Sequence, residues 1–314
     1  MHKILVTTSS FDLENNAAIK ALRDSGCEIV ANPFKRRLTE AEVSGLLTPD
    51  VFGMIAGVEP LTRAVLQNAT ALKVISRAGI GLDSVDLDSA QEFGITVSNT
   101  PQAPVPAVAE LTLGLTLNLL RKISLADSDL RKGQWKPAMG NLLLGKTVGL
   151  IGYGRIGQAT GKLFQAFGCQ LIVSDPVFQG TEEVTSVSLD DLLSSADIVS
   201  LHMPYSPGAH HLIDTAKLGK MKNGSFLINT ARGGLVDEKA LEAALLSGHL
   251  AGAAVDAFEN EPYSGPLAAL PQVVLTAHMG SYAQESRARM ELEAAENLLA
   301  GLRAKGLLNN ANGQ

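Results

Sequence analysis

The stretch that most constrains the fold of this chain runs from Thr147 to Asp175, TVGLIGYGRIGQATGKLFQAFGCQLIVSD. It begins with a short apolar run of the kind that lies buried in a parallel sheet. Three glycines follow in the spacing G-x-G-x-x-G, namely Gly152, Gly154 and Gly157. A helix-forming segment and a second apolar run come next, and Asp175 ends the second run. This pattern predicts a βαβ unit that binds a dinucleotide.

Each residue of the fingerprint has a distinct physical role. Gly152 permits a tight turn, Gly154 lets a pyrophosphate approach the backbone, and Gly157 lets the helix pack closely on the strand. The first amides of the helix then point at the phosphates. Asp175 lies 18 residues after Gly157, where its carboxylate can bind the ribose hydroxyls of NAD and repel the 2′-phosphate of NADP. The alternative, an ordinary glycine-rich turn, is disfavoured by the flanking strand and helix and by the position of the acid.

Bulk properties limit the classes of protein to consider. A chain of 314 residues with 46% apolar and 18% charged residues predicts a soluble protein of two domains. The net charge of -6 disfavours general binding to nucleic acid or membrane. No apolar run reaches the length of a membrane span, and the start does not resemble a signal peptide. Cys27 and Cys169 make no disulfide framework. We therefore expect buried free thiols and a cytoplasmic protein.

Residues 1 to 100 alternate between strand-like and helix-like segments. We expect strands near 4–6, 28–30, 54–55, 73–76 and 95–98, and helices near 15–24, 39–46 and 64–67. No glycine follows the first strand, so this half lacks the phosphate-binding turn. The predicted fold class is α/β, with two Rossmann-like or flavodoxin-like parallel-sheet domains.

Three prolines at positions 101, 104 and 106 mark a boundary between the halves. The tail from 283 to 302 is rich in helix formers, and we expect one long helix that returns to the first domain. The expected domains are 1–100 plus 283–314, which binds substrate, and 101–282, which binds NAD. The run 108–120 is apolar almost all round and predicts a helix buried between domains or subunits, followed by a second helix over 123–131.

Late in the chain, charged groups follow apolar segments that we expect to be strands (198–201, 225–229, 252–255 and 273–276). They are Arg232, Asp256 with Glu261, and His278. The carboxyl ends of parallel strands are where open α/β sheets hold ligands. A guanidinium at Arg232 suits a substrate carboxylate, although it could instead bond nearby carbonyls or Asp237.

The other histidines carry weaker signals. His202 also ends a strand, where a structural or cofactor-lining role is favoured over a catalytic one. We expect solvated side chains at the remaining positions, which are His2, His210, His211 and His249.

At this point a family resemblance is clear over nearly the whole chain. The chain resembles the D-isomer-specific 2-hydroxyacid dehydrogenases, and among them the D-3-phosphoglycerate dehydrogenases. The motifs that carry the resemblance are SRAGIGLDSVDL (76–87), NTPQAPVPAVAE (99–110), GKTVGLIGYGRIG (145–157), NTARGGLVDE (229–238), AGAAVDAFENEP (251–262) and TAHMGS (276–281).

The resemblance implies a catalytic arginine, glutamate and histidine, which fall on Arg232, Glu261 and His278. It places the substrate carboxylate on the loop Arg77-Ala78-Gly79-Ile80-Gly81 of the first domain, with the active site in a cleft between the domains. It implies NAD as cofactor, no metal, and a homodimer through the 108–120 region. The implied cofactor contacts are Gly152, Gly154, Arg155, Ile156, Gly157, Asp175, Thr230, Asp256 and Gly280.

The implied chemistry is the interconversion of a D-2-hydroxy acid and its 2-keto acid. In the reduction, His278 would donate a proton to the carbonyl oxygen, and in the oxidation it would act as base. Glu261 would orient the ring and favour its charged form. Arg232 would bind the carboxylate and polarise the carbonyl.

The substrate itself stays open. Phosphoglycerate enzymes commonly carry an arginine where this chain has Gly57 and then Glu59, and only Lys136 follows Trp135. The candidates are D-3-phosphoglycerate and, alternatively, glyoxylate, hydroxypyruvate or another short 2-keto acid. A hypothesis of another class is an NAD(H)-sensing corepressor-like binding protein, which the presence of the complete triad disfavours.

Overall fold

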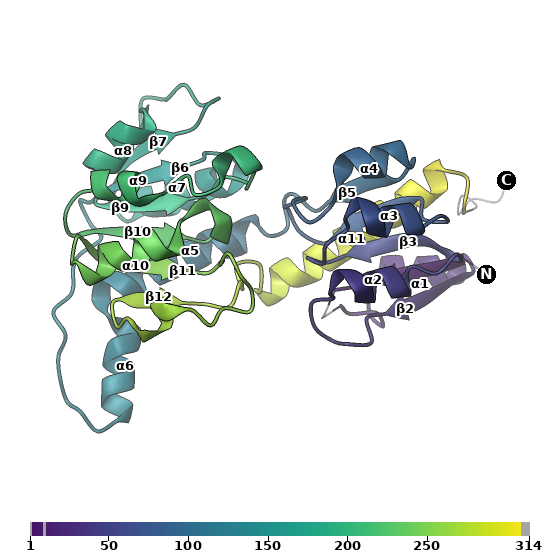
Figure 1. The fold of residues 1–314 in the computed structure, drawn as a ribbon, viewed down its shortest axis with the longest axis horizontal. Coiled ribbons are helices and arrows are strands. Elements are labelled where there is room, and N and C mark those ends of the chain that lie inside the picture. Colours follow the sequence, from purple (N-terminus) through teal and green to yellow (C-terminus); the bar gives the residue numbers. More distant parts are fainter. Residues whose placement is uncertain (1, 9–10, 309–314) are drawn as a thin grey trace. The chain divides into compact units, whose positions relative to one another are not determined.

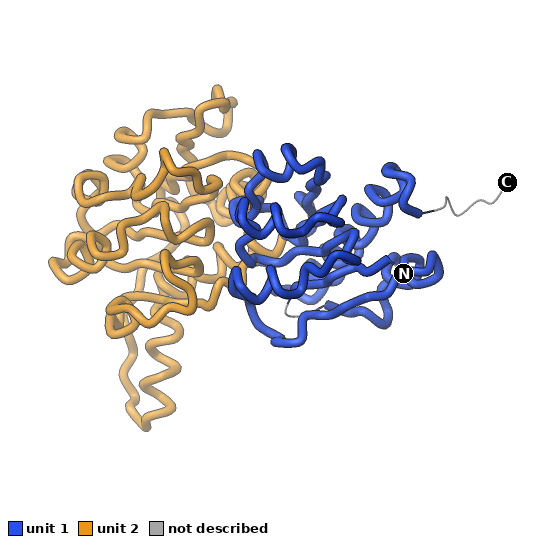
Figure 2. Tube along the Cα trace, turned by 45° about the vertical axis from the view of Figure 1, so that its right-hand side comes forward, with its two compact units in different colours: residues 1–104, 281–314 blue, residues 105–280 orange. Residues whose placement is uncertain are grey.

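The computed structural model describes residues 2–8 and 11–308 of the chain. The chain forms two compact units (Figure 2): unit 1 comprises Met1–Pro104 and Ser281–Gln314, and unit 2 comprises Val105–Gly280. Each unit is built on a parallel sheet, with five strands in unit 1 and seven in unit 2. The predicted fold class, α/β with two parallel-sheet domains, is confirmed.

Unit 1 has the strand order β2-β1-β3-β4-β5. Its strands are β1 (His2–Val6), β2 (Cys27–Ala31), β3 (Val51–Ala56), β4 (Val74–Arg77) and β5 (Thr96–Asn99). Its helices are α1 (Ala17–Asp24), α2 (Glu40–Leu46), α3 (Arg63–Asn68), α4 (Leu87–Glu92) and α11 (Gln284–Ala304). The order reverses between β1 and β3, so the ends of these two strands form a switch point at the ligand-binding edge of the sheet.

Helices cover both faces of this sheet (Figure 1). Alternate residues of β1 point to opposite faces, so Ile4 packs with α1 and α11 while Leu5 packs with the side of α2 and α3. The long helix α11 contacts β3, β4 and β5, although it begins at Gln284, 185 positions after the last of these strands ends at Asn99. The sequence prediction assigned no element to α4, which begins where the Asp86 carboxylate accepts the Ser89 N–H at 2.9 Å.

Unit 2 has the strand order β12-β11-β10-β9-β6-β7-β8. Its strands are β6 (Thr147–Ile151), β7 (Gln170–Ser174), β8 (Val184–Ser186), β9 (Ile198–Leu201), β10 (Ser225–Asn229), β11 (Leu250–Val255) and β12 (Val273–Leu275). Its helices are α5 (Val105–Arg121), α6 (Ile123–Arg131), α7 (Arg155–Ala166), α8 (Leu189–Ser195), α9 (Thr215–Lys220) and α10 (Glu238–Leu246), with short 3-10 helices η1 (Pro207–Ala209), η2 (Gly233–Leu235) and η3 (Pro266–Ala269). The switch point of this sheet lies between β6 and β9.

Two apolar clusters fill the space on either side of the unit 2 sheet. One joins α5 and α7 to the sheet around Phe164, and the other joins α8, α9 and α10 to it around Leu227. Leu115, Leu119 and Leu120 of α5 are therefore covered within unit 2, and α5 and α7 lie side by side. After α5, helix α6 and the segment behind it extend away from the sheet (Figure 1). No described helix has both the length and the apolar character that crossing a membrane requires.

Candidate active site

The glycine turn lies at the switch point of the unit 2 sheet, between β6 and α7. Gly152 has φ +91°, and a Cβ placed there would lie 2.8 Å from the Met203 nitrogen. A Cβ on Gly157 would lie 2.3 Å from the Gly152 carbonyl oxygen, so both positions require glycine. A Cβ on Gly154 would meet nothing within 4 Å. The turn is thus tight underneath and open above, ahead of the first amides of α7 at Arg155, which is the cradle that a pyrophosphate needs.

His202 lies beneath this turn, at the end of β9. Its backbone N–H donates to the Ile151 carbonyl at 2.8 Å, and its Nε2 lies 2.9 Å from the Ser200 hydroxyl. The Nδ1 atom is shielded from solvent and has no hydrogen-bond partner within the described part of the chain. Burial lowers the pKa of His202 to about 3. The ring is therefore neutral at physiological pH, which fits a structural role under the turn and not acid–base chemistry.

Asp175 follows β7 and faces the same turn. Its carboxylate accepts the Tyr153 N–H at 2.8 Å and the Val177 N–H at 2.9 Å. Partial burial opposes ionisation of this carboxyl, but the backbone hydrogen bonds together outweigh it and hold the pKa below the ordinary value. Asp175 is thus a fixed negative charge beside the turn, where it meets the requirement for binding ribose hydroxyls and repelling a 2′-phosphate.

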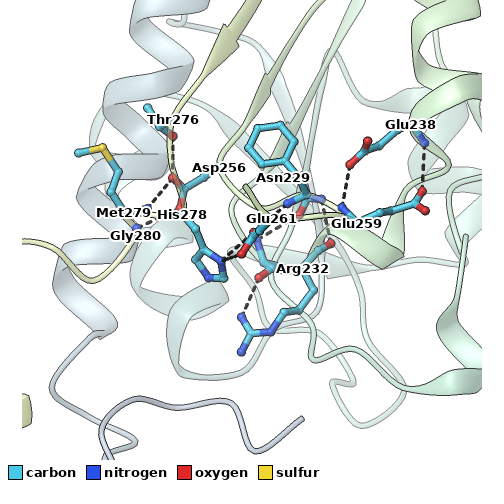
Figure 3. A network of polar contacts seen from close by, with 12 residues as sticks. Asn229, Arg232, Glu238, Asp256, Glu259, Glu261, Thr276, His278, Met279 and Gly280 are labelled. Carbon is cyan, nitrogen blue, oxygen red and sulfur yellow. Dashed lines mark hydrogen bonds and ion pairs between the residues drawn. The ribbon is translucent and has the colours of Figure 1, made fainter. Parts of the chain in front are cut away.

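Asp256 organises the turn that presents His278 (Figure 3). It follows β11, is 1% exposed, and its carboxylate accepts the Thr276 hydroxyl at 2.6 Å, the Met279 N–H at 2.8 Å and the Gly280 N–H at 3.0 Å. Its carbonyl accepts the His278 N–H at 2.8 Å. His278 has φ +50°, a left-handed conformation that is unfavourable for a residue with a side chain. The contacts of Asp256 hold the turn in that conformation.

His278 and Glu261 are in direct contact (Figure 3). The Nδ1 atom lies 2.9 Å from each carboxylate oxygen of Glu261. The Glu261 carboxylate also accepts the Phe258 N–H at 3.1 Å, which fixes it relative to its own loop. The His278 side chain is 37% exposed, so the ring is held on one edge and accessible on the other. Nε2 is the nitrogen left for a substrate.

Arg232 comes from the loop after β10, and Figure 3 shows it on the same side of the sheet edge as the His278 ring. Its Nη1 donates to the Ala231 carbonyl at 2.8 Å, and the Asn229 amide donates to its carbonyl at 2.9 Å. Arg232 therefore bonds a nearby carbonyl, which was the alternative to binding a substrate carboxylate. Asp237 instead caps α10 by accepting the Ala240 N–H at 3.1 Å. The neighbouring Thr230 hydroxyl lies 2.9 Å from that of Thr112 on α5.

The loop after β4 in unit 1 has a tight fold of its own. The Arg77 guanidinium donates to the Ala78 carbonyl at 2.9 Å and lies over Gly79, where a Cβ would be 1.2 Å from Nη1. Gly79 has φ +140°, and its N–H donates to the Thr100 hydroxyl at 2.7 Å. Only glycine fits there. The loop thus presents backbone groups next to a buried guanidinium.

The residues of unit 2 together fit a dinucleotide-dependent dehydrogenase, and comparison with known proteins decides the family. The family model described as "D-isomer specific 2-hydroxyacid dehydrogenase, NAD binding domain" matches residues 113–280. The chain belongs to the D-isomer-specific 2-hydroxyacid dehydrogenase family. It is an NAD-dependent oxidoreductase, and NAD is the cofactor that the glycine turn and Asp175 fit.

Relatives of this dehydrogenase act on more than one substrate. It is similar to a hydroxypyruvate reductase of Thermotoga maritima, with 41% identity over 79% of this chain and 84% of that protein. It is also similar to a D-3-phosphoglycerate dehydrogenase of Methanocaldococcus jannaschii, with 39% identity over 99% of this chain and 60% of that protein. The crystal structure of the TT0316 protein of Thermus thermophilus superposes with a TM-score of 0.88 and 39% identity, covering 96% of this chain and 97% of that one.

Three residues that lie together near the His278–Glu261 pair were not identified from the sequence. Glu238 and Glu259 lie beside Glu261 in Figure 3, and His211 Nε2 lies 2.9 Å from Glu259 Oε1. We expected His211 to be solvated, and its side chain is 32% exposed, but the loop before α9 also brings it against Glu259 in the segment after β11. Glu238 was visible only as the last residue of the motif NTARGGLVDE (229–238), and Glu259 only as part of the motif around Glu261.

Proposed function

We propose that this protein interconverts a D-2-hydroxy acid and its 2-keto acid with NAD, using Arg232, Glu261 and His278 as its catalytic residues. The observation that carries the proposal is the contact of His278 Nδ1 with both oxygens of Glu261 at 2.9 Å. This pair lies at the carboxyl ends of the strands of the sheet that also holds the glycine turn. A histidine held by a carboxylate on one ring nitrogen is suited to exchange a proton on the other.

NAD supplies the acceptor and donor of the hydride that the substrate carbon loses or gains. In the reduction, His278 Nε2 donates a proton to the carbonyl oxygen as negative charge develops there. In the oxidation, the same nitrogen takes the proton of the hydroxyl. The Glu261 carboxylate stabilises the imidazolium form and fixes the plane of the ring. The Arg232 guanidinium binds the substrate carboxylate and polarises the carbonyl.

Residues outside the triad complete the proposal. In unit 1, the loop Arg77, Ala78 and Gly79 binds the substrate carboxylate through its backbone N–H groups and the Arg77 charge. In unit 2, the residues that hold the cofactor are Gly152, Gly154, Arg155, Ile156, Gly157, Asp175, Thr230, Asp256 and Gly280. The structure gives Asp256 and Gly280 a second task, because the hydrogen bond of 3.0 Å between them also maintains the His278 turn.

For the substrate, the candidates are D-3-phosphoglycerate and short acids such as glyoxylate or hydroxypyruvate. Glu59, which is 1% exposed, accepts the Thr7 hydroxyl and the Gly57 N–H at the carboxyl ends of β1 and β3. Burial raises the pKa of the Glu59 carboxyl, although hydrogen bonds and the Arg77 charge oppose this. An acidic group at the switch point of unit 1 is poorly suited to a phosphate. This observation favours a short 2-keto acid without a phosphate.

Oxidation of NADH by a panel of 2-keto acids tests the proposal directly. Glyoxylate, hydroxypyruvate, pyruvate and phosphohydroxypyruvate are compared by kcat/KM, with the H278A variant as the inactive control. We expect turnover of at least one acid and the highest value for glyoxylate or hydroxypyruvate. NADH binding without turnover of any of these acids would contradict the proposal and favour the NAD(H)-sensing corepressor-like alternative.

We also propose a cytoplasmic homodimer. The cytoplasmic location is supported by Cys27 and Cys169, which are both buried free thiols.

The dimer is supported by the exposed apolar side chains between α5 and β6, with Trp135 82% and Met139 88% exposed. The 108–120 region adds Leu111, Leu113 and Leu117, which are only partly buried. Light scattering after size exclusion tests this proposal: we expect a dimer that the double substitution W135D and M139D converts to a monomer.

A further inference from the structure

The segment Phe258–Glu261, which carries the proposed partner of His278, is held on one side by η2. A Cβ on Gly233 would lie 1.8 Å from the Phe258 carbonyl carbon and 2.2 Å from the Glu259 nitrogen. The two backbones are therefore in direct contact, with no side chain between them. A segment held this closely has little freedom to move the Glu261 carboxylate.

A reciprocal pair of contacts holds the same segment from α10. The Glu259 N–H donates to Glu238 Oε1 at 2.8 Å, and the Glu238 N–H approaches Glu259 Oε1 at 3.5 Å (Figure 3). His211 Nε2 meets the same Oε1 at 2.9 Å, and the His211 N–H donates to the Gly234 carbonyl at 2.8 Å. Glu259 thus joins the loop before α9, the start of α10 and the segment after β11.

Taken alone, the carboxylate charges in this cluster are unfavourable for the stability of the fold. Burial raises the pKa of the Glu238 carboxyl, and the charges of Glu259 and Glu261 raise it further, against the Glu259 N–H bond and the His211 charge. The carboxylates of Glu259 and Glu261 therefore lie close enough to disfavour the ionisation of Glu238. Groups arranged against their own stability are concentrated at functional sites.

We propose that Glu238 and Glu259 are positioning residues, which clamp the segment Phe258–Glu261 so that the Glu261 carboxylate faces His278 Nδ1. The inference rests on the proposed function, because it assigns a task only if the Glu261–His278 pair is catalytic. Glu238 acts through its hydrogen bond to the Glu259 N–H. Glu259 acts through its bond to His211, which ties the segment to a second loop.

The consequence for proton transfer follows from the geometry. Within unit 2, the charged groups near the His278 ring include Glu261, Asp256 and Arg232, with the Glu238–Glu259–His211 cluster behind Glu261. Of these, Glu261 alone is in hydrogen-bond contact with the His278 ring within the described residues. Releasing its segment therefore weakens the stabilisation of the imidazolium, so His278 takes up its proton at lower pH.

The test compares E238A, which removes the acceptor, with E238Q, whose amide oxygen can still accept the Glu259 N–H. We expect E238A to lower kcat of the reduction about 10-fold, because loss of outer-layer support typically has effects of this size. The KM for NADH should stay within about twofold, since the glycine turn is untouched. E238Q should restore most of kcat. The matched control is E242A, an identical change one turn further along the same helix, at a residue that makes no hydrogen bond to the segment Phe258–Glu261 in the described part of the chain.

A second readout does not depend on turnover. In protein labelled with ¹⁵N-histidine, the His278 resonance is assigned with H278Q and titrated by NMR. We expect the titration midpoint of His278 to fall in E238A, to return most of the way in E238Q, and to be unchanged in E242A. Equal behaviour of E238A and E242A in both readouts, or an E238Q variant as impaired as E238A, would overturn the clamp.

Folding is monitored by circular dichroism. If E238A does not fold, E238D replaces it, because the shorter side chain keeps the charge and withdraws it from the Glu259 N–H. E238D with wild-type kcat and an unchanged His278 titration would overturn the proposal. The proposed function fails separately, if the wild-type protein binds NADH and reduces no 2-keto acid. In that case the NMR titration still reports whether the clamp exists.

Discussion

The Nδ1 atom of His278 lies 2.9 Å from both carboxylate oxygens of Glu261. A carboxylate placed this way makes Nδ1 the protonated nitrogen of the neutral ring and leaves Nε2 as the acceptor. The two ring nitrogens of His278 therefore have different roles. In the proposed mechanism, Nε2 exchanges the proton with the substrate, and Glu261 compensates the positive charge that results.

The first prediction concerns this pair. H278A should lower kcat/KM by about 100-fold to 10,000-fold, which is the usual contribution of a positioned acid or base. E261Q should lower it less and should move the pH limbs of reduction and oxidation together to lower pH, because the imidazolium loses its negative partner. Steady-state rates in both directions across pH give the answer. Near-normal turnover of H278A at neutral pH would exclude the acid–base assignment.

The second prediction concerns Asp256, the buried organiser of the 276–280 turn. D256A removes the acceptor for the Met279 and Gly280 N–H groups, at 2.8 and 3.0 Å, and His278 should relax from its left-handed conformation. We expect a loss of about 2–4 kcal/mol in the free energy of unfolding, together with a large loss of kcat. T276V, which removes one hydroxyl bond, should lose less of both. Urea denaturation and turnover of the two variants are compared, and equal losses would contradict this ranking.

Sequence reasoning found the parts of the site that depend on strand ends. The fingerprint around Gly152 and the positions of Glu261 and His278 follow from short-range patterns, because the carboxyl ends of parallel strands meet at one edge. The fold class was predicted for the same reason, since alternating strands and helices lead to a parallel sheet.

The remaining features depend on contacts between segments that no local pattern specifies. The left-handed conformation of His278 is set by Asp256, which lies 22 residues earlier. His211 contacts Glu259, which lies 48 positions later in the chain. Because of this contact, a residue that we expected to be solvated belongs to the hydrogen-bond network around Glu259. The strand β8 and the helices α4, α8, α9 and α10 were not predicted, because elements of 3 to 9 residues carry little periodicity.

The third prediction concerns the choice between NAD and NADP. D175A removes a negative charge that is held beside the glycine turn by the Tyr153 and Val177 N–H groups. The 2′-phosphate of NADP then meets less repulsion, and the NAD ribose loses a hydrogen-bond acceptor. We expect the ratio of kcat/KM for NADPH over NADH to rise about 10-fold or more. D191A on α8 is the control, and a ratio for D175A equal to that of D191A would count against the role of Asp175.

The fourth prediction tests the backbone contact behind the Glu261 segment. In G233A the new Cβ would lie 1.8 Å from the Phe258 carbonyl carbon, so one of the two backbones must move. We expect a loss of about 3 kcal/mol or more in stability and a fall in kcat. G219A is the control on α9, where a Cβ meets nothing within 4 Å. It should leave activity unchanged and raise stability by about 0.5–1 kcal/mol. A fully active, stable G233A would show that the contact can relax.

The last prediction concerns His202 and acid stability. Burial lowers the pKa of His202 from 6.5 to about 3 in the folded protein, so the unfolded chain binds this proton more readily. The stabilising effect of the neutral ring is therefore complete above pH 6.5 and is lost as the pH falls from there toward about 3. Between these limits the free energy of unfolding should fall by about 1.4 kcal/mol for each pH unit because of this residue alone.

H202Q removes the titrating group and isolates its effect. Wild type and H202Q are unfolded in urea at several pH values between 5 and 6.5, a window above the ordinary pKa of carboxylates. All other histidines titrate equally in the two proteins and cancel in the difference. The wild-type curve should therefore be steeper, by about 0.7 kcal/mol for each pH unit at pH 6.5 and by about 1.4 kcal/mol near pH 5, whatever the two stabilities at neutral pH. Parallel curves would mean that the His202 ring accepts a proton in the folded protein without penalty, and that the space beneath the glycine turn is hydrated.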